Sequence, residues 1–186
     1  MNKGRVVIVS GPSGAGKTSV IKRLLDEGDL PLRLSVSATT RPPRPGEVDG
    51  VDYHFLSKDD FERRRENGEF LETFEVFGRG YLYGTQKSTV EAILRAGNSV
   101  LLEIDVNGML QVVKHYPDAT TIFVRPPSLE ELERRLRARK TENDETIHAR
   151  LEVAEQEWQF KDRYQHDIVN SDLDETVERL KQLLSN

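Results

Sequence analysis

Short apolar runs alternate with amphipathic helical patterns along most of this chain. The runs at 5–10, 99–104 and 120–124 are largely apolar, which is typical of strands buried on both faces. The first two are followed by segments with helical spacing of apolar residues, at 19–27 and 106–116. Strands that alternate with helices predict an α/β fold with a central parallel sheet covered by helices.

Capping pairs mark where the other helices begin. In four places a serine or aspartate is followed three residues later by an acidic residue: Ser57 with Asp60, Ser88 with Glu91, Ser128 with Glu131, and Asp172 with Glu175. The helix after Ser128 is expected to run to Arg139, and another helix is expected over 143–160. The last helix carries an apolar stripe of Leu173, Val177, Leu180 and Leu184.

The segment 38–85 interrupts this alternation. Three prolines lie within 38–50, so we expect a loop there that joins no regular element. Strand patterns follow at 53–56 and 69–77. We therefore predict one domain. Its core comprises 1–37, 86–138 and 161–186, with an inserted lobe at 38–85 and a small helical lid at about 139–160.

Composition narrows the possible functions. The formal net charge is -5 and there is no cysteine, which argues against general nucleic-acid binding and excludes disulfides and cysteine chemistry. No apolar run approaches membrane-spanning length. We expect a cytoplasmic protein without membrane or nucleic-acid partners.

The loop after the first apolar run carries the clearest chemical signal. Residues 11–18 read GPSGAGKT and fit the pattern G-x-x-x-x-G-K-[ST] between a strand and a helix. Backbone N–H groups of such a loop surround phosphates, the lysine adds a positive charge, and the threonine hydroxyl binds Mg²⁺. We expect ATP to bind at Gly11, Ser13, Gly14, Ala15, Gly16, Lys17 and Thr18, with Thr18 as the metal ligand.

Two arginines point to a second anion site. Arg41 and Arg44 lie on the proline-stiffened stretch, and a pair of guanidinium groups suits a dianionic phosphate. Taken alone, the same residues could be two solvated side chains on a surface loop.

Several motifs resemble guanylate kinases. They are Ser35-Val-Ser-x-Thr-Thr-Arg-x-Pro-Arg-x-Gly-Glu-x-x-Gly-x-Asp-Tyr-x-Phe55, GEFLE at 68–72, YGT at 83–85, LLEID at 101–105, RPPS at 125–128 and RKTE at 139–142. The resemblance covers essentially the whole chain, in order. It departs from the family pattern at Lys140, where the lid usually has glycine, and in a turn at 77–83 that is two residues longer.

The resemblance implies roles for eight acceptor-site residues. Arg41, Arg44, Tyr53 and Tyr83 would hold a monophosphate; Ser37, Glu72, Thr85 and Asp105 would surround its base. The longer turn leaves open whether Tyr81 or Tyr83 reaches the phosphate, and we choose Tyr83. Chemistry supports the base assignment, because guanine presents N1–H and an amino group as adjacent donors that one carboxylate can accept. Without the resemblance, Glu72 would read as a solvated strand residue.

The resemblance also implies roles on the donor side. Arg135 and Arg139 lie four residues apart on one helix face, and with Arg150 and Lys17 they would neutralise the transferring phosphoryl group. Paired with nearby glutamates, these arginines could instead form an ordinary solvated helix. Asn170 resembles the position that contacts the donor adenine. Glu103 is either a partner of the metal site or a plain strand residue.

The predicted function is ATP-dependent, Mg-assisted phosphorylation of GMP and dGMP with release of ADP, in purine nucleotide metabolism. One alternative is a guanylate-kinase-like module that binds proteins, although such modules usually lack a working phosphate loop. Another is a kinase for a ribose phosphate, which would have no use for a carboxylate such as Glu72. A regulatory GTPase is rejected because no guanine-reading N-K-x-D sequence follows the loop.

Overall fold

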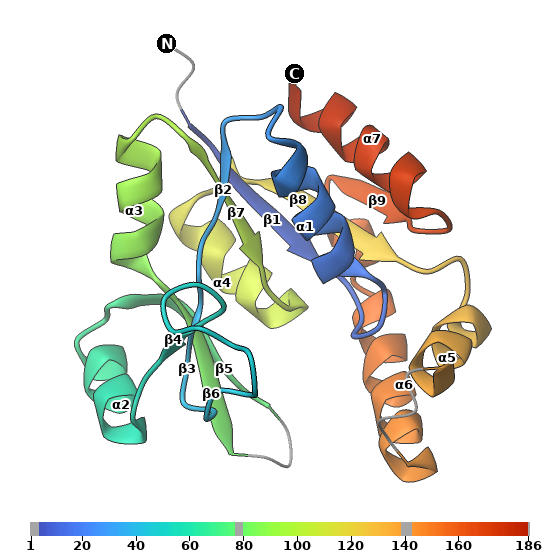
Figure 1. Cartoon of the computed structure of the whole chain (residues 1–186), viewed down its shortest axis with the longest axis horizontal. Helices are drawn as coiled ribbons and strands as arrows, with labels where there is room; N and C mark the ends of the chain where they lie inside the picture. Colours follow the sequence, from blue (N-terminus) through green and yellow to red (C-terminus); the bar gives the residue numbers. More distant parts are fainter. Residues whose placement is uncertain (1–3, 77–79, 139–142, 186) are drawn as a thin grey trace.

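A five-stranded parallel sheet forms the centre of the molecule (Figure 1). The computed structural model describes residues 4–76, 80–138 and 143–185. In spatial order the strands are β2 (Leu32–Leu34), β7 (Ser99–Glu103), β1 (Val6–Ser10), β8 (Thr120–Arg125) and β9 (His166–Val169). The covering helices are α1 (Lys17–Glu27), α3 (Lys87–Arg95), α4 (Val106–His115) and α7 (Leu173–Ser185). The predicted fold class is confirmed.

Alternate residues of β1 explain how both faces of the sheet are covered. Val6 and Ile8 belong to a core that includes α3 and α4, whereas Val7 and Val9 pack with α1 and α7. Because both faces of the central strand are buried, the strand reads as a continuous apolar run.

The inserted segment forms a second sheet with its own small core. Its strands, in the order β4-β3-β6-β5, are β4 (His54–Phe55), β3 (Ala38–Thr39), β6 (Tyr81–Gln86) and β5 (Phe70–Val76). Helix α2 (Lys58–Glu66) covers this sheet through Phe61, which stacks on Phe70 at 4.5 Å between ring centroids. We refer to this unit as the lobe.

Three local expectations were wrong. Ala38 and Thr39 were expected in a loop but form β3, because they precede the first proline and retain N–H groups for pairing with β4 and β6. Helix α3 begins at Lys87 after Gln86, without the expected Ser88 side-chain cap. Leu173 was expected in the apolar stripe of the last helix, but 39% of its surface is exposed.

Helices α5 (Leu129–Ala138) and α6 (Asp144–Trp158) pack against each other through Leu132, Leu136, Ile147 and Ala154. Helix α5 also contacts the phosphate loop, since a Cβ built on Gly14 would lie 2.9 Å from the side chains of Leu132 and Leu136. Figure 1 shows this pair and the lobe extending on the same side of the molecule, beyond the carboxyl ends of the parallel strands. Both therefore flank the phosphate loop. The proposed boundaries of core, lobe and lid stay predictions.

Within 4–76, 80–138 and 143–185, no helix combines the length and the apolar character needed to cross a membrane.

Candidate active site

The phosphate loop lies where β1 ends and α1 begins. Gly11 has φ of +140°, and a Cβ there would lie 1.9 Å from the carbonyl oxygen of Val124 on β8. Only glycine allows this close approach of two backbones. The first N–H groups of α1 then face the end of the sheet, where an anion is favoured.

Lys17 and Thr18, the first two residues of α1, make different contacts. The Nζ of Lys17 donates to the carbonyl oxygens of Gly11 at 2.6 Å and Pro12 at 3.0 Å. Thr18 Oγ1 donates to Glu103 Oε1 at 2.8 Å. Glu103 ends β7, the parallel neighbour of β1, so the sheet itself brings this carboxylate to the threonine. The structure thus places Glu103, left open by the sequence, at the loop.

A second polar cluster lies where the lobe meets the start of α4. Glu72 on β5 is 2% exposed, and its Oε1 accepts a hydrogen bond of 2.7 Å from Thr85 Oγ1 on β6. Its Oε2 accepts none from any described residue. A Cβ on Gly108 would lie 3.2 Å from that oxygen and 3.3 Å from Asp105 Oδ1. The two carboxylates therefore flank the first turn of α4.

Burial dominates the electrostatics of these carboxylates. The pKa of Glu72 is raised to about 7, mainly by burial; the hydrogen bonds from Thr85 oppose this shift and the nearby Asp105 carboxylate adds to it. Burial also raises the pKa of Asp105, against the effect of the hydrogen bond that it accepts from the Gly108 N–H at 2.7 Å. A buried carboxylate with an unpaired oxygen is costly. Such a group suits a ligand that presents N–H donors.

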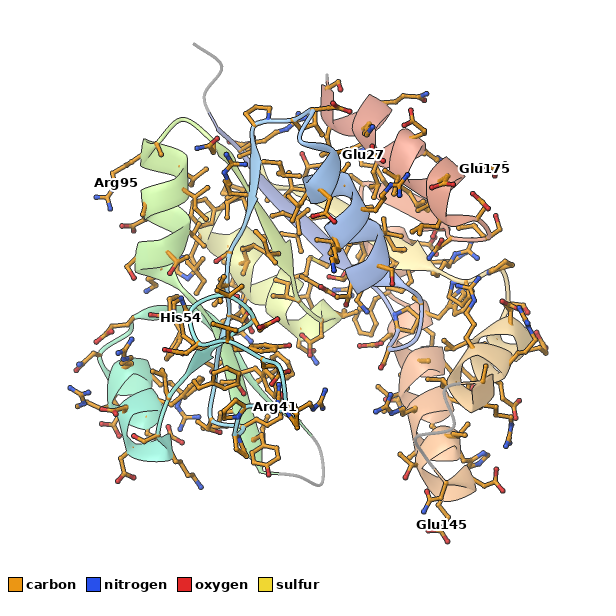
Figure 2. All side chains as sticks on the ribbon, viewed as in Figure 1. Glu27, Arg41, His54, Arg95, Glu145 and Glu175 are labelled. Atoms are coloured by element: carbon orange, nitrogen blue, oxygen red, sulfur yellow. The ribbon has the colours of Figure 1, made fainter. Side chains whose placement is uncertain are left out.

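The lobe also holds a compact cationic cluster around Arg41, which is labelled in Figure 2. The guanidinium of Arg41 donates to both carboxylate oxygens of Glu47, at 3.0 and 2.8 Å, and the Nε of Arg41 donates to the Tyr83 hydroxyl at 3.2 Å. The Tyr53 ring lies 5.4 Å from the guanidinium carbon. Arg44 has an exposed side chain, and its backbone N–H donates to Glu47 at 2.7 Å.

Tyr83, rather than Tyr81, is the tyrosine beside Arg41. Its ring meets that of Tyr53 edge-on at 5.8 Å between centroids. Burial, above all, raises the pKa of the Tyr53 hydroxyl. Ser37 is half-buried at the start of the lobe, where its carbonyl oxygen accepts from the His54 N–H at 2.9 Å.

Two of the arginines predicted on the donor side contact the phosphate loop, and for Arg135 this contact is NH1 to the Ala15 carbonyl oxygen at 3.5 Å. Arg135 donates through NH2 to the backbone oxygen of Asn170 at 2.9 Å and through Nε to Glu131 at 2.7 Å. Arg150 NH1 lies 3.4 Å from the hydroxyl of Ser13 in the loop. Arg139 and Lys140 lie outside the described residues.

The sequence reasoning missed two carboxylates. Glu47 was part of a quoted motif but was given no role. Its pairing with Arg41 depends on a turn that brings residues 41 and 47 together. Glu157 on α6 has its pKa raised to about 7 by burial, with Lys17 opposing and Asp105 adding to the shift. No sequence signal marks Glu157, because it resembles any acidic helix residue.

A family model, sequence relatives and a solved structure show the family of this chain. A family model described as guanylate kinase matches residues 3–186. A guanylate kinase of Rhodopirellula baltica is 54% identical over 183 residues, covering 97% of this chain and 87% of that protein. One from Rubrobacter xylanophilus is 47% identical over 184 residues, covering 99% and 95%. The crystal structure of guanylate kinase from Anaplasma phagocytophilum matches with a TM-score of 0.80 at 34% identity, covering 100% of this chain and 86% of that one.

Proposed function

This chain belongs to the guanylate kinase family and is an enzyme of that type, and on this premise we propose how its residues perform the reaction. An oxygen of the GMP phosphate attacks the γ-phosphorus of ATP, the bond to the β–γ bridging oxygen breaks, and ADP and GDP form. We propose that dGMP is also an acceptor and that the reaction belongs to purine nucleotide metabolism. The observation that carries the proposal is the buried Oε2 of Glu72, which lacks a donor among the described residues and lies beside the start of α4.

The acceptor base would fill the space beside Glu72. Guanine would donate its N1–H and its amino group to this carboxylate, and Thr85 would keep the carboxylate oriented through the bond that it already makes. Asp105 and Ser37 would complete the base site. Adenine would present a bare N1 acceptor to the same carboxylate, which leaves buried polar groups opposed and disfavours AMP by several orders of magnitude.

The acceptor phosphate would bind at the Arg41 cluster. Arg41 already contacts both Tyr53 and Tyr83, and its NH1 and NH2 groups are held by Glu47. Arg44, which is exposed, would supply the second guanidinium. Because the acceptor phosphate is itself an anionic nucleophile, the reaction needs no general base.

The donor phosphates would lie on the loop formed by Gly11, Ser13, Gly14, Ala15, Gly16, Lys17 and Thr18. Arg135 and Arg150 approach that loop from α5 and α6. Together with Arg139, they would neutralise the charge that develops during transfer and would exclude water from the two nucleotides.

Magnesium fits the donor set at Thr18. A threonine hydroxyl and a carboxylate oxygen lie 2.8 Å apart there, and Mg²⁺ prefers oxygen ligands while keeping several waters. Among the described residues there is no cluster of three acidic or histidine side chains that could bind a cation unaided. Thr18 would hold the ion and Glu103 a water bound to it. The ion would neutralise phosphate charge when present.

A coupled assay of ADP release tests the proposal. The acceptors are GMP, dGMP, AMP, UMP and ribose 5-phosphate, each with MgATP. Turnover with GMP and dGMP alone is expected. No turnover with any acceptor would favour a protein-binding module, and equal turnover with AMP would refute the base site. Glu72→Gln should reduce guanine selectivity while the protein remains folded, whereas an unfolded variant would indicate a structural role.

A further inference from the structure

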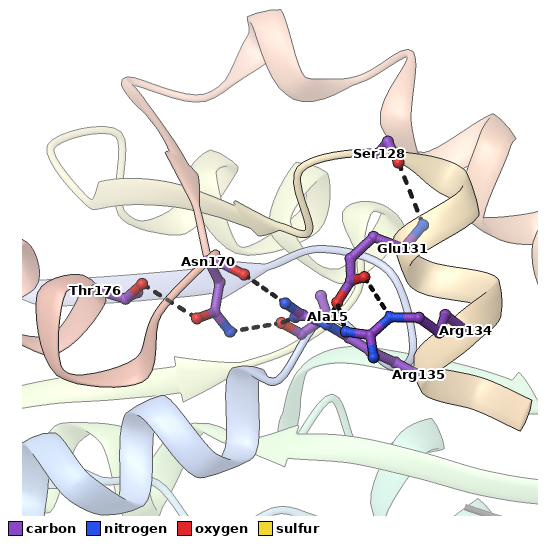
Figure 3. A network of polar contacts seen from close by, with 7 residues as sticks. All are labelled: Ala15, Ser128, Glu131, Arg134, Arg135, Asn170 and Thr176. Carbon is purple, nitrogen blue, oxygen red and sulfur yellow. Dashed lines mark hydrogen bonds and ion pairs between the residues drawn. The ribbon is translucent and has the colours of Figure 1, made fainter. Parts of the chain in front are cut away.

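Asn170 connects the end of β9 to the phosphate loop (Figure 3). Its side chain is buried, with 6% of the residue exposed. The Nδ2 group donates to the carbonyl oxygen of Ala15 at 2.8 Å. Oδ1 lies 3.1 Å from the hydroxyl of Thr176, which shares its single proton between this oxygen and the Asp172 carbonyl oxygen at 2.6 Å. Both polar ends of this amide are therefore bonded within the protein.

The orientation of this amide is determined by its partners. The Ala15 oxygen can only accept, so Nδ2 must face it. Thr176, near the start of α7, lies at the opposite end of the amide. The backbone of Asn170 is held as well, since its N–H donates to the Arg125 oxygen at 2.7 Å and its oxygen accepts from Arg135 at 2.9 Å.

The bond to Ala15 has a consequence for the next residue of the loop. In a planar trans peptide, the carbonyl of residue 15 and the N–H of residue 16 point in opposite directions. Because Asn170 holds the Ala15 carbonyl on its own side, the Gly16 N–H is directed to the other side. Arg135 NH1, at 3.5 Å, approaches the same carbonyl and reinforces this orientation.

The packing around Gly16 agrees with this arrangement. Gly16 has φ of +89° and is the N-cap of α1. A Cβ built on it would lie 2.5 Å from Asn170 Nδ2. The loop backbone therefore lies directly on the Asn170 amide, with no room for a side chain between them.

We propose that Asn170 is a positioning residue for the donor triphosphate. It turns the Ala15–Gly16 peptide so that the Gly16 N–H faces the phosphates, and Thr176 fixes the Asn170 amide for this task. The inference rests on the proposed function only in placing the donor phosphates at the loop. It differs from the adenine contact that the family resemblance implies, because it needs no base on the ligand.

Two probes separate these roles: ATP, which carries a base, and inorganic tripolyphosphate, which does not. Binding of each, with magnesium, is measured by calorimetry to the parent protein and to Asn170→Asp. The new carboxylate opposes the Ala15 carbonyl, so affinity for both probes should fall by the same factor, about tenfold or more. Asn98→Asp adds the same charge just before β7, at the opposite edge of the sheet, and controls for net charge.

A second pair of variants guards against misfolding of Asn170→Asp. Thr176→Val removes the hydroxyl that holds Asn170, and Thr176→Ser keeps one. Thr176→Val should lower the affinity for both probes more than Thr176→Ser does. The affinity for GMP should be preserved in both variants.

Loss of ATP affinity with tripolyphosphate affinity retained would overturn the inference in favour of a base contact. Unchanged affinity for both probes in Asn170→Asp would also overturn it. Failure of the proposed function would appear separately, as a parent protein that binds both probes but transfers no phosphate to GMP.

Discussion

Arg41 and Glu47 form a two-point ion pair, in which NH1 lies 3.0 Å from Oε2 and NH2 lies 2.8 Å from Oε1. The guanidinium is largely removed from solvent, with 8% of its side chain exposed. Glu47 therefore keeps Arg41 extended and oriented before an acceptor phosphate arrives.

We expect Glu47→Gln to raise the KM for GMP by about tenfold, because the arginine loses the partner that orients it. The KM for ATP should change little, since Glu47 lies on the lobe. Steady-state kinetics with each substrate varied in turn measure both values. Glu66→Gln on the exposed surface of α2 is the matched control. An unchanged KM for GMP would show that Arg41 is oriented without Glu47.

The same pair predicts a change in acid stability. Hydrogen bonds from Arg41, and then from the Arg44 N–H, hold the pKa of Glu47 below its usual value of 4.5. The stability that this carboxylate contributes is therefore present above pH 4.5 and is lost as the pH falls through the lowered pKa. Over that acidic range, the free energy of unfolding measured with urea should fall more for the parent than for Glu47→Gln. Parallel curves for the two proteins would contradict this.

The raised pKa of Glu72 predicts the opposite trend at higher pH. Burial raises this pKa from 4.5 to about 7, so the folded protein holds a proton that the unfolded chain releases between those values. The cost of burying Glu72 is absent below pH 4.5, grows as the pH rises, and reaches about 3 kcal/mol above pH 7. Glu72→Gln should gain stability over the parent between pH 5 and pH 8, as measured by urea unfolding.

Binding of GMP should depend on the same proton. The guanine donors favour the ionised carboxylate, so GMP should bind about tenfold more weakly at pH 6 than at pH 8 and should release a proton near pH 7. Calorimetry in two buffers of different ionisation enthalpy measures the proton. The phosphate of GMP also titrates near pH 6, and Glu72→Gln supplies that baseline. Equal pH dependence in parent and variant would exclude Glu72 as the titrating group.

Lys17→Ala should abolish most phosphoryl transfer while GMP binding is retained. Its Nζ lies on the phosphate loop, 2.6 Å from the Gly11 oxygen, whereas the proposed GMP site lies on the lobe. Loss of one charged donor at the transferred group costs about 10²–10³ in kcat. Lys22→Ala, exposed on α1, is the control. A drop in GMP affinity equal to the drop in kcat would point to a general structural defect.

Two glycines with positive φ should respond differently to alanine. Gly28 has φ of +69° and nothing within 4 Å of the position that a Cβ would take, so Gly28→Ala should cost about 1 kcal/mol of stability and leave activity intact. Gly16 has φ of +89° and the Asn170 amide 2.5 Å from its Cβ position. Gly16→Ala should therefore also lose MgATP affinity. Equal MgATP affinity in the two variants would show that the loop tolerates a side chain there.

Much of the fold could be predicted from local sequence. Burial on both faces makes β1, β7 and β8 continuous apolar runs, and the glycines of the phosphate loop follow from the backbone that the motif requires. The short strand at Ala38–Thr39 could not be predicted, because two residues carry no periodicity and their pairing partner lies at 83–84.

The candidate site likewise has parts that follow from local sequence and parts that depend on tertiary contacts. The sequence by itself determined the phosphate loop and the parallel sheet, because both depend on neighbouring residues along the chain. Only the tertiary structure decided that Thr18 meets Glu103, 85 residues away, and that Ala15 meets Asn170, 155 residues away. These contacts arise because parallel strands place their carboxyl ends at one edge of the sheet, and the spacing of residues along the chain does not record which side chains meet there.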